Sequence, residues 1–180
     1  SGDARHNRIV LATRYDSTEP LALALWRQDA TALTPVSLTH VEPADGGYVR
    51  LEVDLPTPDT YYLYAFCQHL GDELVSRSPL GRFLAPPAPD TLRPIRIGAS
   101  SCAYNALPPL TLGHASQRDD LELFCFLGDT SYNDGCYTIE EFRESWASNL
   151  GKRQFIDLRQ STSVIATWDD HEITNDWDPE

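Results

Sequence analysis

The sequence is poor in basic residues for the amount of acid that it carries. Lys and Arg total 14 against 27 Asp and Glu, which gives a net charge of −13 at pH 7 over 180 residues. Affinity for nucleic acids depends on neutralising phosphates with Lys and Arg, so this balance argues against a nucleic-acid partner. Two interpretations of the acid excess stay open: a solvated acidic surface, or carboxylates partly neutralised by bound cations.

Long apolar runs and paired cysteines are lacking as well. No run approaches the roughly 20 apolar residues that cross a bilayer, so we expect no membrane span. The four cysteines include no CxxC pair and are too scattered for a disulfide framework, which leaves the redox compartment open. The polar start has neither a cleavable signal nor an initiator Met, so we expect a processed or engineered N-terminus from which an export signal could have been lost.

Short strands are the pattern of residues 8–84. Residues 48–55 alternate between apolar and charged side chains, as in a strand with one buried face. Residues 21–26 are apolar throughout, as in the central strand of a sandwich, and turn signals separate the runs at near-regular spacing. The pattern predicts a small antiparallel β-sandwich, immunoglobulin- or fibronectin-like, in which one of residues 61–64 serves either as a tyrosine corner or in core packing.

The proline-rich stretch that begins at Pro86 marks a domain boundary. Pro86, Pro87 and Pro89 favour a stiff, extended linker, because proline fits neither the interior of a sheet nor that of a helix. We therefore predict a sandwich domain over 1–85, a linker over 86–94 and a second domain over 95–180.

The pattern changes after the linker. Residues 95–99, 121–127 and 163–168 read as strands, the second almost wholly apolar, which suggests a buried parallel sheet. A capping box at Thr138 opens a predicted helix over 139–150, and a second short helix is expected around 155–159.

Polar side chains follow each of these predicted strands. Cys102 follows the first, Asp129 and Tyr132 follow the second, and Asp169-Asp170-His171 follows the third. Ligands of open parallel sheets collect beyond the carboxyl ends of the strands, so these loops are expected to meet. Adjacent carboxylates repel one another unless a cation or solvent separates them, and carboxylate, phenolate, imidazole and thiolate are all metal ligands. A pair of cations so held activates a water for attack on a phosphoryl group.

Each candidate also has a plain structural explanation. Asp129 fits a turn or a helix cap, Tyr132 fits core packing, and Cys102 fits a small buried apolar residue. Asp169 and Asp170 fit a solvated loop or a cap. Because every candidate falls at a predicted strand end, we favour a metal site.

Three segments carry a resemblance to a known family. Residues 100–102 (SSC), 126–134 (FLGDTSYND) and 166–176 (ATWDDHEITND) resemble the alkaline phosphatase D (PhoD-like) metallophosphatases, which are relatives of the calcineurin-like and purple acid phosphatases. The predicted sandwich also resembles the domain that precedes the catalytic domain in this family. The resemblance implies a mixed fold: the immunoglobulin/fibronectin-like sandwich followed by the first half of an αββα, calcineurin-like metallophosphatase domain.

The same resemblance implies a site and a reaction. Cys102, Asp129 and Tyr132 would bind iron, with Asp129 bridging to a second metal, calcium. Asp170 would occupy the place of a metal-bridging Asn, and His171 would stabilise the transition state or protonate the leaving oxygen. The implied reaction is attack of a metal-bound hydroxide on a phosphate mono- or diester.

One departure from the family limits this reading. The family's catalytic domain continues with a second half that supplies further strands and His ligands, whereas only His171 of five His lies in a recognised motif here. We therefore expect an incomplete enzyme, inactive alone, whose missing half comes from the same gene product or a second chain. The alternatives are a non-catalytic fragment whose sandwich serves binding, and a metal-binding protein without turnover. Asp169 and Asn175 are weaker site candidates, and His114 is expected in a polar loop. The resemblance favours a periplasmic or secreted location.

Overall fold

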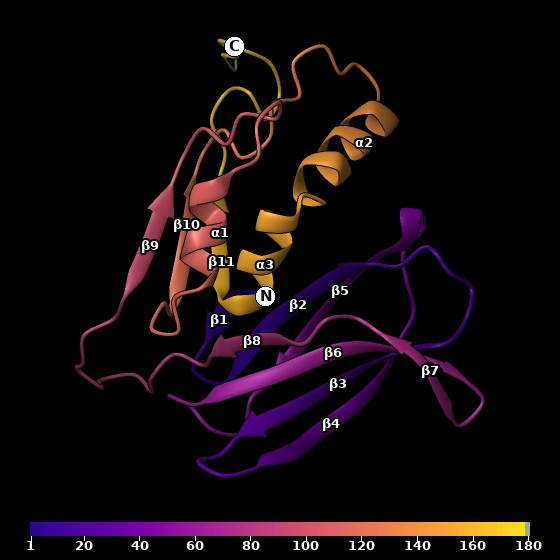
Figure 1. Ribbon diagram of the computed structural model, residues 1–180, viewed down its shortest axis with the longest axis vertical. Helices are drawn as coiled ribbons and strands as arrows, with labels where there is room; N and C mark the ends of the chain where they lie inside the picture. Colours follow the sequence, from indigo (N-terminus) through magenta and orange to yellow (C-terminus); the bar gives the residue numbers. More distant parts are fainter. Residues whose placement is uncertain (179–180) are drawn as a thin grey trace. The chain divides into compact units, whose positions relative to one another are not determined.

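The computed structural model describes residues 1–178 and divides the chain into two compact units, Ser1–Pro94 and Ile95–Glu180 (Figure 1). Pro179 and Glu180, at the end of the predicted segment 95–180, lie outside the described residues. Within the described part of the chain, no helix is long and apolar enough to cross a membrane.

Unit 1 consists of two antiparallel sheets. One sheet has the order β5-β2-β1, and the other has the order β4-β3-β6-β7 with β8 also paired to β6. The strands are β1 (Gly2–Arg5), β2 (Arg8–Arg14), β3 (Leu21–Gln28), β4 (Leu33–Val41), β5 (Tyr48–Asp54), β6 (Tyr61–Leu70), β7 (Glu73–Arg77) and β8 (Gly81–Leu84), with a short 3-10 turn at Asp45–Gly47.

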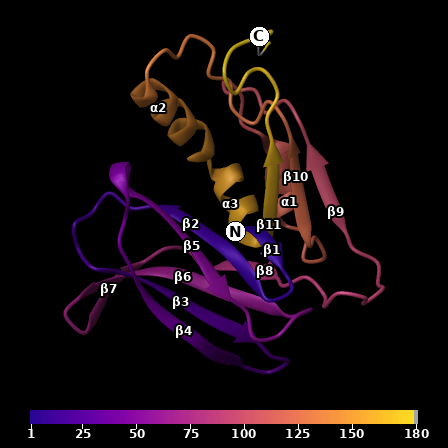
Figure 2. The ribbon, with the colours of Figure 1, turned by 180° about the vertical axis from the view of Figure 1, so that it is seen from behind.

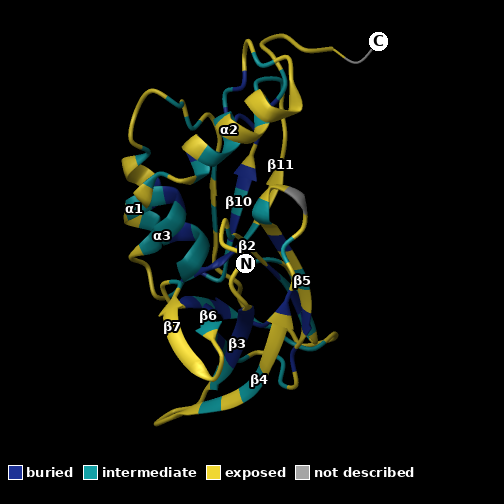
Figure 3. Ribbon diagram, turned by 90° about the vertical axis from the view of Figure 1, so that its right-hand side faces the viewer, coloured by how far each residue is buried: buried dark blue, intermediate teal, exposed yellow. Residues whose placement is uncertain are grey.

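The two sheets of unit 1 share one apolar core. Val49 and Val53 of β5 are buried and Leu51 packs against the same core, while the charged residues between them are exposed, as the alternation predicts. Strand β3 is buried over its first five residues (Figure 3). Tyr62, wholly buried, donates its hydroxyl to the carbonyl of Thr57 and accepts from the Thr57 N–H, each at 2.9 Å. This is the hydrogen bond of a tyrosine corner, which ties the entry of β6 to the loop before it.

Unit 2 is built on a parallel sheet with β10 in the middle, which confirms the predicted parallel pairing (Figure 2). Its strands are β9 (Ile97–Ser100), β10 (Leu123–Leu127) and β11 (Ser163–Thr167), and its helices are α1 (Leu110–Ser116), α2 (Ile139–Leu150) and α3 (Arg153–Ser161).

Helices α1 and α3 cover one face of this sheet. Phe124 and Phe126 point to the same side of β10 and pack with Leu112 of α1 and with Phe155 and Leu158 of α3, all of them buried. Full burial of such a side chain contributes about 1.5–3 kcal/mol, so this cluster anchors both helices.

The opposite face of the same sheet presents apolar side chains to solvent. Ile97 is 57% exposed, Leu127 55% and Ile165 47%. In the parallel register Ile97 lies opposite Leu123 and Ile165 lies opposite Cys125, and side chains alternate along a strand, so all of these residues share one face. Helices of unit 2 cover one face of this sheet, whereas its other face exposes a group of apolar side chains.

The predicted capping box of α2 is confirmed, and one helix was missed. The Glu141 N–H donates to the Thr138 hydroxyl at 3.2 Å, while the Glu141 carboxylate accepts from the Thr138 N–H at 2.9 Å. The predicted polar loop around His114 is wrong, since His114 lies in the last turn of α1. This helix is short and contains Gly113, so its sequence carries little helical signal; burial of Leu112 forms it instead.

Candidate metal centre

The predicted ligands meet beyond the carboxyl ends of the parallel strands. One ligand atom each from Asp129, Asp170 and His171 lies within 4.8 Å of the other two. Asp129 follows β10, and the other two residues follow β11, so pairing of these two neighbouring strands brings together residues 41 and 42 positions apart in sequence (Figure 1). Two carboxylates and an imidazole at this spacing form a group that can hold a cation.

Asp129 is the centre of the cluster. Its Oδ2 accepts from the Tyr132 hydroxyl at 3.3 Å and from the Cys102 thiol at 3.5 Å, so the other four predicted site residues lie around it. The residue is only 8% exposed, and its Oδ1 is buried without a hydrogen-bond partner among the described residues. A buried carboxylate oxygen without a donor is unfavourable in the protein alone, and a cation removes that penalty. The donor set therefore fits a metal.

Tyr132 is held in its protonated form in the metal-free chain. Burial, followed by the negative charges of Asp129 and Cys102, raises the pKa of its phenol well above the ordinary value. Coordination by phenolate therefore requires displacement of a proton by the metal.

Strained backbone shapes the two ligand loops. Asp129 has φ +52° and Cys102 has φ +57°, in the left-handed region that residues other than glycine seldom adopt. Gly128, at φ +104°, lies so close to Asp169 that an added Cβ would be 2.7 Å from the Asp169 Cβ. Only glycine fits there, and its small size lets the loops after β10 and β11 approach each other.

Glu172 joins these two loops, and the sequence analysis gave it no role. Its carboxylate accepts from the backbone N–H of Asp129 at 3.2 Å, of Asp169 at 2.9 Å and of Thr130. The residue is 5% exposed, so a single buried anion satisfies donors from both ligand loops. Its position directly after His171 was the only available signal.

Asp134 is a second residue without an assigned role. Its carboxylate contacts Nδ1 of His171 at 2.8 and 3.0 Å and accepts from the Asn175 N–H at 2.6 Å. Burial lowers the pKa of His171, but the hydrogen bond and charge of Asp134 outweigh it and raise that pKa on balance. Burial raises the pKa of Asp134, yet the bonds from Asn175 and His171 bring it below its ordinary value. The pair fixes the imidazole with Nε2 left for other contacts.

We expect Asp134→Asn to lower the pKa of His171 in the metal-free chain. NMR titration of the His171 ring measures it, with Asp178→Asn as a control that leaves the titration unchanged. The pair stabilises the fold fully below about pH 6.5, the ordinary His value, and its contribution is lost as pH rises through the raised folded pKa. It is also lost as pH falls through the lowered pKa of Asp134, so the variant should destabilise most between about pH 4 and 6.5. An unchanged His171 titration would contradict the assignment.

Polar residues behind Tyr132 hold its loop. Asn105 donates from Nδ2 to the Tyr132 carbonyl at 2.7 Å and accepts the Tyr132 N–H at 3.2 Å. Lys152 in turn donates to the Asn105 carbonyl at 2.5 Å and to Oδ1 of Asn149 at 2.7 Å. The position of the phenol is thus set by side chains outside the ligand set.

The two weaker candidates lie beside the cluster. Asp169 is exposed, and only its backbone N–H reaches Glu172. Asn175 contacts Asp134 through its N–H and Asp176 through its side chain. Neither belongs to the group of atoms that can hold a cation.

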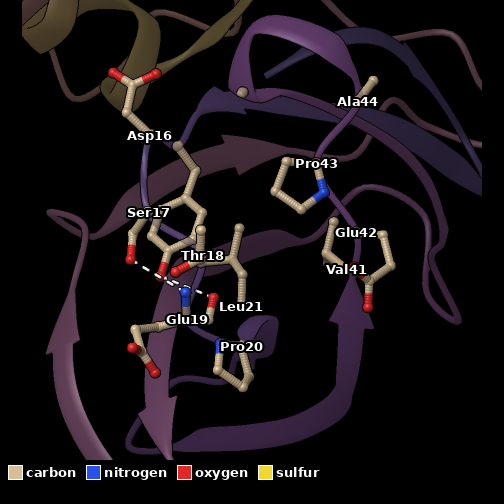
Figure 4. A pocket seen from close by; sticks show the side chains of 12 residues that line it. Asp16, Ser17, Thr18, Glu19, Pro20, Leu21, Val41, Glu42, Pro43 and Ala44 are labelled. Carbon is tan, nitrogen blue, oxygen red and sulfur yellow. Dashed lines mark hydrogen bonds between the residues drawn. The ribbon is translucent and has the colours of Figure 1, made fainter.

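A pocket of about 610 Å³ lies in unit 1 (Figure 4). Its lining includes Asp16, Glu19 and Glu42, and the Tyr15 hydroxyl donates to the Glu19 carbonyl across one side. None of the predicted site residues lines it, so this pocket and the metal cluster are separate features of the described chain.

Two solved structures share the fold of this chain, with its parallel sheet and the Asp-His cluster beyond the carboxyl ends of the strands. The structure of PhoD matches with a TM-score of 0.83 at 22% identity over 98% of this chain and 39% of that chain. The purple acid phosphatase PPD1 from yellow lupin (Lupinus luteus) seeds matches with a TM-score of 0.60 at 16% identity over 94% of this chain and 34% of that chain. The chain thus spans about two fifths or less of these proteins' length. A sequence comparison with curated proteins gave no match.

The family assignment comes from the second unit. Residues 99–180 match the family described as PhoD-like phosphatase. The predicted resemblance is therefore confirmed: this part of the chain is similar to the PhoD-like phosphatases.

Proposed function

We propose that this chain supplies the first part of the active site of a metal-dependent hydrolase of phosphate mono- or diesters. The observation that carries the proposal is the buried, partnerless Oδ1 of Asp129 within a cluster that contains Asp170 and His171. The family match over residues 99–180 supports the same chemistry. In this proposal residues 1–85 form an immunoglobulin/fibronectin-like domain, 86–94 the linker and 95–180 the first half of an αββα domain.

The ligand set suits iron and calcium. Cys102, Asp129 and Tyr132 would hold iron, and Asp129 and Asp170 would hold calcium, because thiolate and phenolate suit iron and carboxylates suit calcium. When bound, such a cation pair supplies an activated water and holds the attacking and leaving oxygens of the phosphoryl group. The protein contributes the fixed positions of these side chains through Gly128 and Glu172.

His171 would act on the leaving oxygen. Asp134 holds Nδ1, so Nε2 is the ring nitrogen that remains to donate a proton to that oxygen. The raised pKa of His171 keeps the imidazole protonated to higher pH, which favours the role of an acid.

Completion of the site would require further chain. Ile97, Leu127 and Ile165 expose an apolar sheet face, and we propose that a second half, from the same gene product or a second chain, covers it. A phosphatase assay compares this chain with a longer product that contains the second half. Turnover by the short chain would contradict this part of the proposal, and a longer product without turnover would favour the alternative of a non-catalytic binding module.

Iron binding tests the ligand set directly. Addition of ferric iron to this chain is expected to give a visible tyrosinate-to-iron charge-transfer band that Tyr132→Phe removes. Tyr104→Phe is the matched control, because the Tyr104 ring lies 5.3 Å from the Tyr132 ring but is absent from the ligand set. Iron affinity should increase with pH, since the raised pKa of Tyr132 makes binding release a proton. A band that persists in Tyr132→Phe would refute the assignment.

A further inference from the structure

A small aromatic pocket adjoins the metal cluster. It has a volume of about 200 Å³ and is lined by Trp168, Asp169, Asp170 and Trp177. The two indole rings are 6.3 Å apart between centroids and inclined by 32°, and they are unusually open, with Trp168 66% and Trp177 41% exposed. Tryptophan is mostly buried in folded proteins, so two open indoles around one pocket suggest a binding role.

The chemistry of the pocket suits an organic cation. Indole faces attract cations within about 6 Å of the ring centroid, and at this separation one cation can lie within reach of both rings. Asp169 adds an exposed carboxylate that is outside the group of possible metal ligands. The pocket is smaller than the roughly 300–1,000 Å³ of drug-sized ligand sites, so it fits a small headgroup.

The charge of the protein favours the same class of ligand. With a net charge of −13 the chain repels a purely anionic ester, whereas a substrate that also carries a positive group avoids part of this repulsion. Asp170 belongs both to the metal cluster and to the pocket wall, so a group in the pocket lies next to the place of the phosphate.

We propose that Trp168, Trp177 and Asp169 bind the quaternary ammonium group of a zwitterionic phosphate ester, one in which a short alcohol links the cation to the phosphate. This inference rests on the proposed function and names the substrate class for that site.

The test compares binding of choline with binding of its neutral isostere, 3,3-dimethylbutan-1-ol, to this chain. Binding is followed by tryptophan fluorescence and by the NMR signals of the indole N–H groups. Choline is expected to bind about tenfold more tightly than the isostere. Trp168→Leu and Trp177→Leu should each abolish the preference, and Asp169→Asn should weaken it. Trp26→Phe, in unit 1, is the matched control and should change nothing.

Metal binding is measured on the same variants, so that the two proposals can fail separately. Lost choline preference in Trp168→Leu with iron binding retained supports the pocket assignment. Equal affinity for choline and the isostere, or a preference that survives both Trp→Leu changes, would overturn it while leaving the metal site standing. If the chain prefers choline over the isostere but binds no iron, the proposed metal-dependent function is overturned. The link between the pocket and phosphate esters then fails as well.

Discussion

Asp129→Asn is expected to abolish metal binding by this chain without weakening the metal-free fold. Asp129 is the residue around which the other candidate ligands lie, and an amide oxygen is a far weaker ligand than a carboxylate. Mutation of a residue that only hydrogen-bonds to a metal ligand typically lowers metal affinity by about 10–100-fold. Removal of the ligand Asp129 itself should therefore lower metal affinity by at least about 100-fold. Calorimetric titration with iron measures the effect.

The metal-free stability of the same variant should change little. Asn removes the buried negative charge of Asp129, but its amide nitrogen takes the unpartnered position, so the free energy of unfolding should stay constant within about 1 kcal/mol. Thermal unfolding with and without iron should therefore show a metal-dependent gain in the wild type that is absent from the variant. Asp72→Asn, at an exposed turn in unit 1, is the control and should retain the gain. If Asp129→Asn binds iron as the wild type does, the metal centre is wrongly placed.

Glu172→Gln is expected to destabilise unit 2 by about 2–4 kcal/mol, from loss of a charged acceptor and the cost of an unsatisfied buried donor. Both carboxylate oxygens of Glu172 accept backbone N–H groups, so in either orientation the amide nitrogen of Gln faces a donor. Metal affinity should decrease as well, because the loops that carry Asp129 and Asp170 are joined through this side chain. Urea unfolding and iron titration measure the two effects.

Glu144→Gln, on the exposed surface of α2, is the matched control for Glu172→Gln and should change stability by less than about 0.5 kcal/mol. A stability loss in Glu172→Gln with unchanged iron affinity would show that Glu172 supports the fold without positioning the ligands. An unchanged stability would contradict the structure of the buried carboxylate.

Local sequence signals predicted several elements well. The alternation in residues 48–55 predicted β5, and the capping box at Thr138 predicted the start of α2, because both patterns report contacts within a few residues. The apolar run 121–127 predicted a buried strand, observed as β10, flanked by β9 and β11 in parallel register. The five candidate site residues were predicted because polar side chains follow each buried strand at the edge where ligands of parallel sheets collect.

Other features depend on contacts between distant residues. Glu172 contacts the backbone of Asp129, 43 residues earlier, and His171 contacts Asp134 across 37 residues. Glu172 and Asp134 both occur in segments that contain other acidic residues. The sequence therefore does not distinguish an acid that positions a ligand from an acid that is itself a ligand. Helix α1 was missed for a related reason, since its stability comes from burial of Leu112 rather than from helical propensity.

The sequence by itself determined the resemblance of residues 99–180 to the PhoD-like phosphatases, the residue types of the candidate metal cluster and the parallel pairing expected of its strands. Only the tertiary structure decided how those residues meet: which oxygen of Asp129 lacks a partner, which acid orients His171, and which tryptophans form a pocket next to Asp170. The physical reason is that the chemical type of each candidate metal ligand depends on one residue of the sequence. Hydrogen-bond partners and pocket walls depend instead on which strands pair, and those strands are far apart in the chain.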